Sequence, residues 1–158
     1  MKKYFIGGGV LVLIVVLLSW GKLFGAKPLA FWNNTDIACL PNGHTNVSLH
    51  FHPELGITVD GANEQIPANI GSTAACMSEV HTHDATGKIH IEAVKAGRTY
   101  TLNDFFHVWG KDIARPDYTL TMTVDGQPNP ELGDLVLKDA QKIELVYTSA
   151  AEATSTAQ

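Results

Sequence analysis

The chain has 158 residues, of which 17% are charged and 45% hydrophobic, and its formal net charge is −5. This length accommodates one ordinary domain with extensions at its ends. No lysine or arginine occurs between Lys27 and Lys88, whereas that interval contains six acidic residues. Because nucleic-acid binding depends on cationic side chains that neutralise phosphates, this half of the chain argues against a nucleic-acid partner and favours metal cations.

The N-terminus predicts a membrane anchor. Residues 1–3 form a short basic end, and the uncharged run from Tyr4 to Trp20 is long enough to cross a bilayer, so we expect a transmembrane helix over 4–22. The two lysines ahead of it favour a cytoplasmic N-terminus and an extracytoplasmic domain, periplasmic or at the cell surface. Ser19 and Gly21 are a mediocre cleavage site, which favours an uncleaved signal anchor over a signal peptide.

After the anchor, residues 23–38 show no sustained period and predict a spacer. The folded domain is expected over 39–148, and the small polar residues 149–158 predict a disordered tail. The cysteines are Cys39 and Cys76. Outside the cytoplasm a disulfide between them is favoured, although free thiols are the alternative.

The first half of the domain shows alternating apolar and polar residues, which predicts short strands near 46–52 and 55–59 with a return strand near 63–67. Asp60 and Gly61 form a dipeptide typical of tight hairpin turns. In "GKIHIEAV" the alternation predicts a half-buried strand with His90 and Glu92 on one face.

A helix is predicted where Leu102, Phe105, Phe106 and Trp109 recur at helical spacing, with Thr101 and Asp104 as a capping box. These apolar side chains are expected in the core rather than in a ligand pocket. The runs "YTLTMTV" and "KIELVY" predict two final strands. The order of strands, helix and strands predicts an α+β, predominantly β domain, a small β-grasp-like sheet with one packed helix, with a small sandwich as the alternative.

The histidines carry the strongest chemical signal. Side chains two apart on a strand share a face, so "LHFHPE" presents His50 with His52, and "VHTHD" presents His81 with His83. On adjacent strands these four imidazoles could share one ion, and imidazole is a ligand of zinc and copper. The paired H-x-H motifs therefore predict a transition-metal site, whereas a proton-responsive or merely polar surface is the simpler alternative.

Other residues near these motifs are candidates for subsidiary roles. His90 is a candidate further ligand that could equally face solvent. Asp84 is a candidate ligand or an acceptor that orients an imidazole, and Glu54 and Glu92 are further candidate acceptors of this kind. Cys76 could be a soft ligand if it is not in a disulfide. His44, in the turn-like "PNGHTN", and His107, on the polar helix face, are expected to be exposed.

The sequence as a whole favours a membrane-anchored, extracytoplasmic domain that binds copper or zinc for sequestration, delivery or sensing. Copper is slightly favoured because Cys76 and Met77 could serve Cu(I). One alternative is a metalloenzyme with three histidine ligands and Asp84 or Glu92 as its base. Another is a non-catalytic interaction module that docks a membrane protein. The sequence names no substrate and favours no catalytic assignment.

Several segments together resemble a set of small secreted or membrane-anchored domains of bacteria and archaea. They are "HFHPELGITVDG", "IPANIG", "VHTHDATGKIHIEA", "TYTLNDFFHVWG" and "TMTVDGQ", spanning about residues 50–126. Members of that set usually have glycine where this chain has Asn103 or Asp104. The resemblance implies marked positions at His50, His52, His81, His83, Asp84 and His90. It implies no activity, so function has to be argued from the site.

Overall fold

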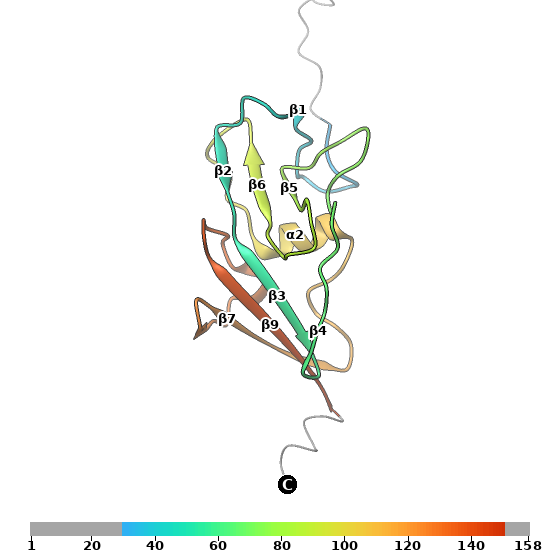
Figure 1. The fold of residues 1–158 in the computed structure, drawn as a ribbon, viewed down its shortest axis with the longest axis vertical. Helices are drawn as coiled ribbons and strands as arrows, with labels where there is room; N and C mark the ends of the chain where they lie inside the picture. The colour runs from blue at the N-terminus through green and yellow to red at the C-terminus, as the bar shows by residue number, and fades with distance from the viewer. Residues whose placement is uncertain (1–29, 151–158) are drawn as a thin grey trace, which may run out of the picture.

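The computed structural model describes residues 30–150 (Figure 1). In chain order its elements are β1 (Pro41–His44), β2 (Leu49–Phe51), β3 (Glu54–Val59), β4 (Ala62–Asn63), β5 (Val80–His81), β6 (His90–Ala93), α2 (Leu102–Trp109), β7 (Tyr118–Val124), β8 (Gln127–Pro128), the 3-10 helix η1 (Leu132–Asp134) and β9 (Lys142–Ser149). The predicted α+β, predominantly β class is confirmed.

The strands form two sheets, so the expectation of one β-grasp-like sheet is wrong in this respect. One sheet has the order β2-β6-β5, and the other β4-β3-β9-β7-β8 with β3 parallel to β9. In Figure 1 the first lies above the second. The chain changes sheets at Pro53, which has no N–H to continue a ladder, while the next residue, Glu54, donates to the Gln141 carbonyl.

The predicted hairpin at Asp60 and Gly61 is confirmed: both have positive φ, and they join β3 to its antiparallel partner β4. This backbone suits a type I′ turn, which matches the twist of the flanking strands. Asp125 and Gly126 form an equivalent turn from β7 into β8. Strand β9 then lies between β3 and β7 and forms the centre of the larger sheet.

Helix α2 begins and ends as its sequence predicts. Thr101 and Asp104 form the reciprocal capping box, and Gly110 ends the helix with φ of 75°. Phe105 and Phe106 are fully buried in the core, which includes residues of both sheets, whereas Trp109 is only partly buried. Phe105 and Phe106 are therefore core, as expected, and Trp109 packs against that core.

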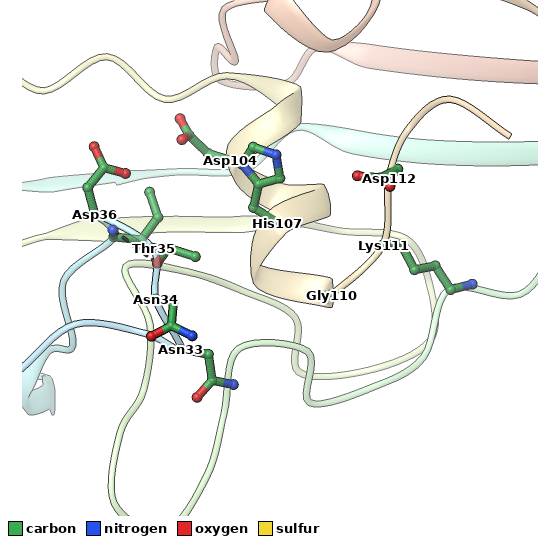
Figure 2. Close-up of a pocket in the computed structure, with 10 residues that line it drawn as sticks. Asn33, Asn34, Thr35, Asp36, Asp104, His107, Gly110, Lys111 and Asp112 are labelled. Atoms are coloured by element: carbon green, nitrogen blue, oxygen red, sulfur yellow. Dashed lines mark hydrogen bonds between the residues drawn. The ribbon is translucent and has the colours of Figure 1, made fainter.

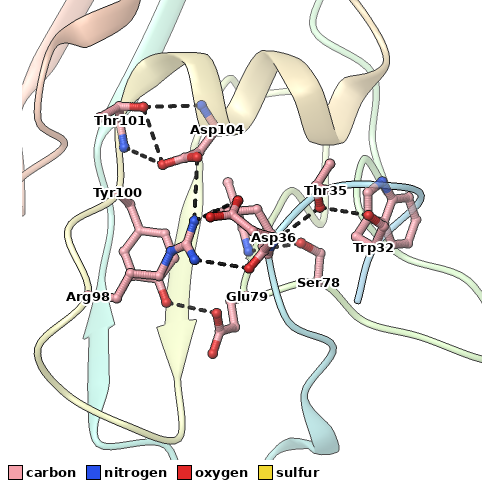
Figure 3. Close-up of polar contacts among 11 residues, drawn as sticks. Trp32, Thr35, Asp36, Ser78, Glu79, Arg98, Tyr100, Thr101 and Asp104 are labelled. Carbon is pink, nitrogen blue, oxygen red and sulfur yellow. Dashed lines mark hydrogen bonds and ion pairs between the residues drawn. The ribbon is translucent and has the colours of Figure 1, made fainter. Parts of the chain in front are cut away.

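Residues 30–38 pack against the domain, although the sequence assigned them to the spacer. Trp32 and Ile37 belong to the core, and the Trp32 indole donates to the Val108 carbonyl at 2.9 Å. Arg98 donates to the backbone carbonyl and to a carboxylate oxygen of Asp36 (Figure 3). The apolar side chains in this stretch follow neither helical nor strand periodicity. The sequence pattern therefore did not predict that they belong to the domain.

The predicted basic end, the transmembrane helix over 4–22 and most of the tail lie outside the described residues. Ser149, expected in the tail, is the last residue of β9 and donates its N–H to Asp60. Within residues 30–150, no helix has the length and apolarity needed to cross a membrane.

Candidate metal centre

The register of the three-stranded sheet places several metal-capable side chains on one face. His90 and Glu92 lie two apart on β6, so they share a face. The antiparallel register sets His50 of β2 opposite Glu92, and His81 of β5 opposite His90. Directly opposed residues point to the same side of a sheet. The other face of β6 carries Ile91, which is fully buried in the core.

Six of the seven histidines gather at this face together with one carboxylate. They fall into two groups, and within each group the candidate ligand atoms lie within 4.8 Å of one another. The first group is His44, His81, His83 and Glu92; the second group is His50, His52 and His90. The rings of His83 and His90 are 4.4 Å apart between centroids, so the two groups adjoin.

His81 is the most deeply buried ligand candidate. Its side chain is fully buried, and Nδ1 lies 2.9 Å from the Ser78 carbonyl. A carbonyl only accepts, so Nδ1 carries the proton and Nε2 carries a lone pair. That Nε2 lies 3.2 Å from Nε2 of His83. A metal-ligating histidine usually donates a hydrogen bond from its other ring nitrogen, and this hydrogen bond fixes its tautomer.

The segment that carries the Ser78 carbonyl is held in place by hydrogen bonds and by a disulfide. Ser78 and Glu79 donate their N–H groups to the carbonyls of Gly71 and Ala38. The Tyr100 hydroxyl donates to the Glu79 carboxylate at 2.9 Å, as Figure 3 shows. Just upstream, a disulfide joins Cys76 to Cys39. These contacts fix the carbonyl that orients His81.

Glu92 belongs to the first group but also lies close to two histidines of the second, and its side chain is only 1% exposed. Its Oε2 is 2.6 Å from Nδ1 of His44, while its Oε1 is 3.2 Å from Nε2 of His50 and 3.7 Å from Nδ1 of His90. Burial works to raise the pKa of Glu92, but the hydrogen bond from His44 and the nearby imidazoles outweigh it and lower that pKa. The carboxylate is therefore ionised at neutral pH.

Three of the imidazoles are neutral at the same pH. Burial, reinforced by neighbouring histidines, lowers the pKa of His81 and of His90 to about 4. The pKa of His52 is also lowered, chiefly by burial and then by His50 and Lys88. A neutral imidazole keeps a lone pair, which metal coordination requires. The site thus offers unprotonated nitrogens around an anionic carboxylate.

The five predicted histidine ligands are all in this cluster, but their grouping differs from the expected one. The pair His81 and His83 belongs to the first group, and the pair His50 and His52 belongs to the second. His90 completes the second group. The two pairs separate because β6 runs between β2 and β5 in the sheet.

Sequence reasoning missed His44 as a site residue. Its side chain is 48% exposed, consistent with the expectation, but Nδ1 contacts a carboxylate 48 positions further along the chain. Glu92 was expected only to orient an imidazole or act as a base, whereas the structure places it among the candidate ligands. The only local signal for His44 was its turn-like surroundings, which predict exposure.

Two other predicted site residues do not join the described groups. Asp84 is exposed, and its Oδ1 accepts from the backbone N–H and the hydroxyl of Thr86, an arrangement typical of a local turn. Cys76 is bonded to Cys39, so it has no thiolate to offer a metal. The two groups are consequently built from nitrogen and oxygen ligands.

His107 is exposed on helix α2, as predicted. It lines a pocket of about 490 Å³. Figure 2 shows that this pocket lies between helix α2 and residues 33–36. Asp104 and Asp112 also line this pocket, but they form no metal-capable group with His107 among the described residues. The pocket and the histidine cluster are therefore separate features.

The chain matches no protein-family model, no curated protein and no solved structure. The resemblance to small secreted or membrane-anchored domains stays a prediction. The function is accordingly argued from the residues of the site.

Proposed function

We propose that this protein is a membrane-anchored, extracytoplasmic domain that binds a transition metal, copper or zinc, for sequestration, delivery or sensing. The observation that carries the proposal is the pair His81 and His83. The Ser78 carbonyl turns the lone pair of His81 Nε2 toward His83, beside the ionised and buried Glu92.

The spacing of the two imidazoles fits a shared ion. Zinc binds histidine nitrogen at about 2.0–2.1 Å in a tetrahedral shell, which separates neighbouring ligand nitrogens by about 3.3 Å. The Nε2 atoms of His81 and His83 are 3.2 Å apart. His44 and Glu92 supply the remaining candidate ligands of the first group. The group therefore has the ligand composition of a four-ligand zinc or copper site, and the spacing of its two Nε2 atoms fits a shared ion.

The ligand chemistry favours a divalent ion. Imidazole and carboxylate suit Zn²⁺ and Cu²⁺, whereas sulfur ligands select Cu(I). The disulfide between Cys39 and Cys76 removes the thiolate that had favoured Cu(I). Disulfides also persist in oxidising compartments, which supports the proposed extracytoplasmic location of the domain.

The test is metal binding by the full-length protein purified in detergent. Metal-free protein is dialysed against Zn²⁺ or Cu²⁺, and bound metal is measured by elemental mass spectrometry for wild type, His81→Ala/His83→Ala and His107→Ala. We expect wild type and the His107 control to bind metal tightly and the double variant to lose the tightest site. Wild-type protein that retains neither metal contradicts the proposal.

A second candidate function is metal-assisted hydrolysis at the second group. That group supplies three histidines, and its His50 is 50% exposed, as in catalytic zinc sites that keep one position for water. The test is azide binding to Co²⁺-substituted protein. A shift of the visible spectrum supports an open coordination position, and an unchanged spectrum argues against catalysis.

A further inference from the structure

We infer that the cluster holds two metal ions that share the carboxylate of Glu92, one ion in the first group and one in the second. The inference rests on the proposed function, because it concerns the same histidine cluster. It adds the number of ions and the side chain that couples them.

The two oxygens of Glu92 face different groups. Oε2 lies against His44 of the first group, and Oε1 lies toward His50 and His90 of the second group. A carboxylate can place one oxygen on each of two ions, as in two-metal sites with ions about 3.5–4 Å apart. The side chain is 1% exposed, so its oxygens are turned inward to the imidazoles rather than to solvent.

One ion cannot use all of these ligands. A tetrahedral ion takes four, which the first group already supplies with three histidines and Glu92. His50, His52 and His90 then remain as a separate set of three, with their candidate ligand atoms within 4.8 Å of one another. Oε1 of Glu92 lies 3.2 Å from Nε2 of His50 and 3.7 Å from Nδ1 of His90, which makes it the candidate fourth ligand of the second ion.

His90 provides independent evidence for a ligand in the second group. Its Nδ1 is buried and has no hydrogen-bond partner among the described residues. Buried polar atoms in native proteins are almost always paired, and each exception calls for an explanation. Its ring centroid lies 4.4 Å from that of His52. An ion between these rings would give His90 the partner that the protein itself does not supply.

The electrostatics predict stepwise binding. Glu92 is the only carboxylate in the two groups, so two divalent ions would leave the centre strongly positive. Lys88 adds a further positive charge near His52. The first ion therefore repels the second, and we expect the second group, which contains no buried ligand, to fill last and more weakly.

The test is a titration of metal-free, full-length protein in detergent with Zn²⁺ by calorimetry and with Cu²⁺ by electron paramagnetic resonance. We expect two successive binding steps and two ions per chain. The copper signal should rise to the first equivalent and then broaden and lose integrated intensity toward the second, because two ions on one carboxylate couple their spins. These wild-type measurements decide the inference without any variant.

Variants then assign the second ion. His50→Ala/His52→Ala should bind one ion per chain and retain an isolated copper signal at saturation, while His107→Ala should behave as wild type. His50 is half-exposed, and circular dichroism of the metal-free variant checks that it remains folded. Loss of the second step in this variant alone supports the assignment, and an unchanged second step overturns it.

Each remaining outcome has a distinct meaning. One ion per chain in wild type overturns the second site but leaves the proposed function intact. Two ions with independent, undiminished copper signals overturn the sharing of Glu92. No bound ion overturns both the inference and the proposed function.

Discussion

Glu92 lies directly opposite His50 in the register of β6 and β2, and its carboxylate reaches His50 on one side and His44 on the other. The pairing of β2 with β6 alone sets the contact with His50. The contact with His44 depends on β1, a strand that belongs to neither of the two sheets. The carboxylate thus joins parts of the chain that the sequence pattern does not connect.

The first prediction concerns the charge of that carboxylate. Glu92→Gln keeps the size of the side chain but removes its negative charge, so we expect zinc affinity to fall by about 10-fold or more. The measurement is competition with a chromophoric chelator. An affinity equal to that of the His107→Ala control would show that Glu92 takes no part in binding.

The second prediction is that acid destabilises the metal-free protein through His81. Burial lowers its pKa from 6.5 to about 4. Between these values the unfolded chain binds the proton and the folded chain does not, so stability falls as the pH falls through this range. Because the side chain is fully buried, the shift corresponds to a loss on the order of 3 kcal/mol.

The matched variant for this prediction is His81→Asn, whose amide N–H can still donate to the Ser78 carbonyl but does not titrate. Urea unfolding of the metal-free protein at several pH values between about 7 and 4 gives the free energy of unfolding. We expect a shallower pH dependence in the variant than in wild type. Parallel curves for the two proteins would contradict the assigned role of His81.

The third prediction concerns the disulfide between Cys39 and Cys76, which are 37 positions apart. Closing a loop of this length restricts the unfolded chain and stabilises the fold by about 4 kcal/mol in the chain-entropy model. In urea unfolding, Cys39→Ala/Cys76→Ala should lose a large part of this stabilisation. Dithiothreitol should destabilise wild type and leave the variant unaffected. Equal stability of both proteins without reductant would refute the prediction.

The fourth prediction tests whether residues 30–38 belong to the domain. Trp32→Phe keeps an aromatic ring but leaves the Val108 carbonyl without its donor, and should cost about 1 kcal/mol. Trp32→Ala also empties part of the core and should cost about 3–5 kcal/mol. If Trp32→Ala matched wild type in urea unfolding, this segment would be a spacer after all.

The elements with a strong local pattern were predictable. Helix α2 follows from its apolar spacing, its capping box and Gly110, and the hairpin at Asp60 and Gly61 follows from the positive φ that the dipeptide tolerates. The division of the strands into two sheets was not predictable. The alternation of apolar and polar residues along a strand indicates which side chains share a face, but it does not indicate which strands pair with it.

The sequence by itself determined that His50 and His52, and likewise His81 and His83, form two pairs of imidazoles. Spacing along one strand is a local property of the extended backbone. The tertiary structure decided which other residues each pair meets. Because β6 lies between β2 and β5, the pairs enter different groups, and Glu92 of the first group also contacts His50 of the second. The tertiary structure also placed His44 in the cluster. The contact of His44 with Glu92 joins residues 48 positions apart, and no sequence pattern predicts a contact over this distance.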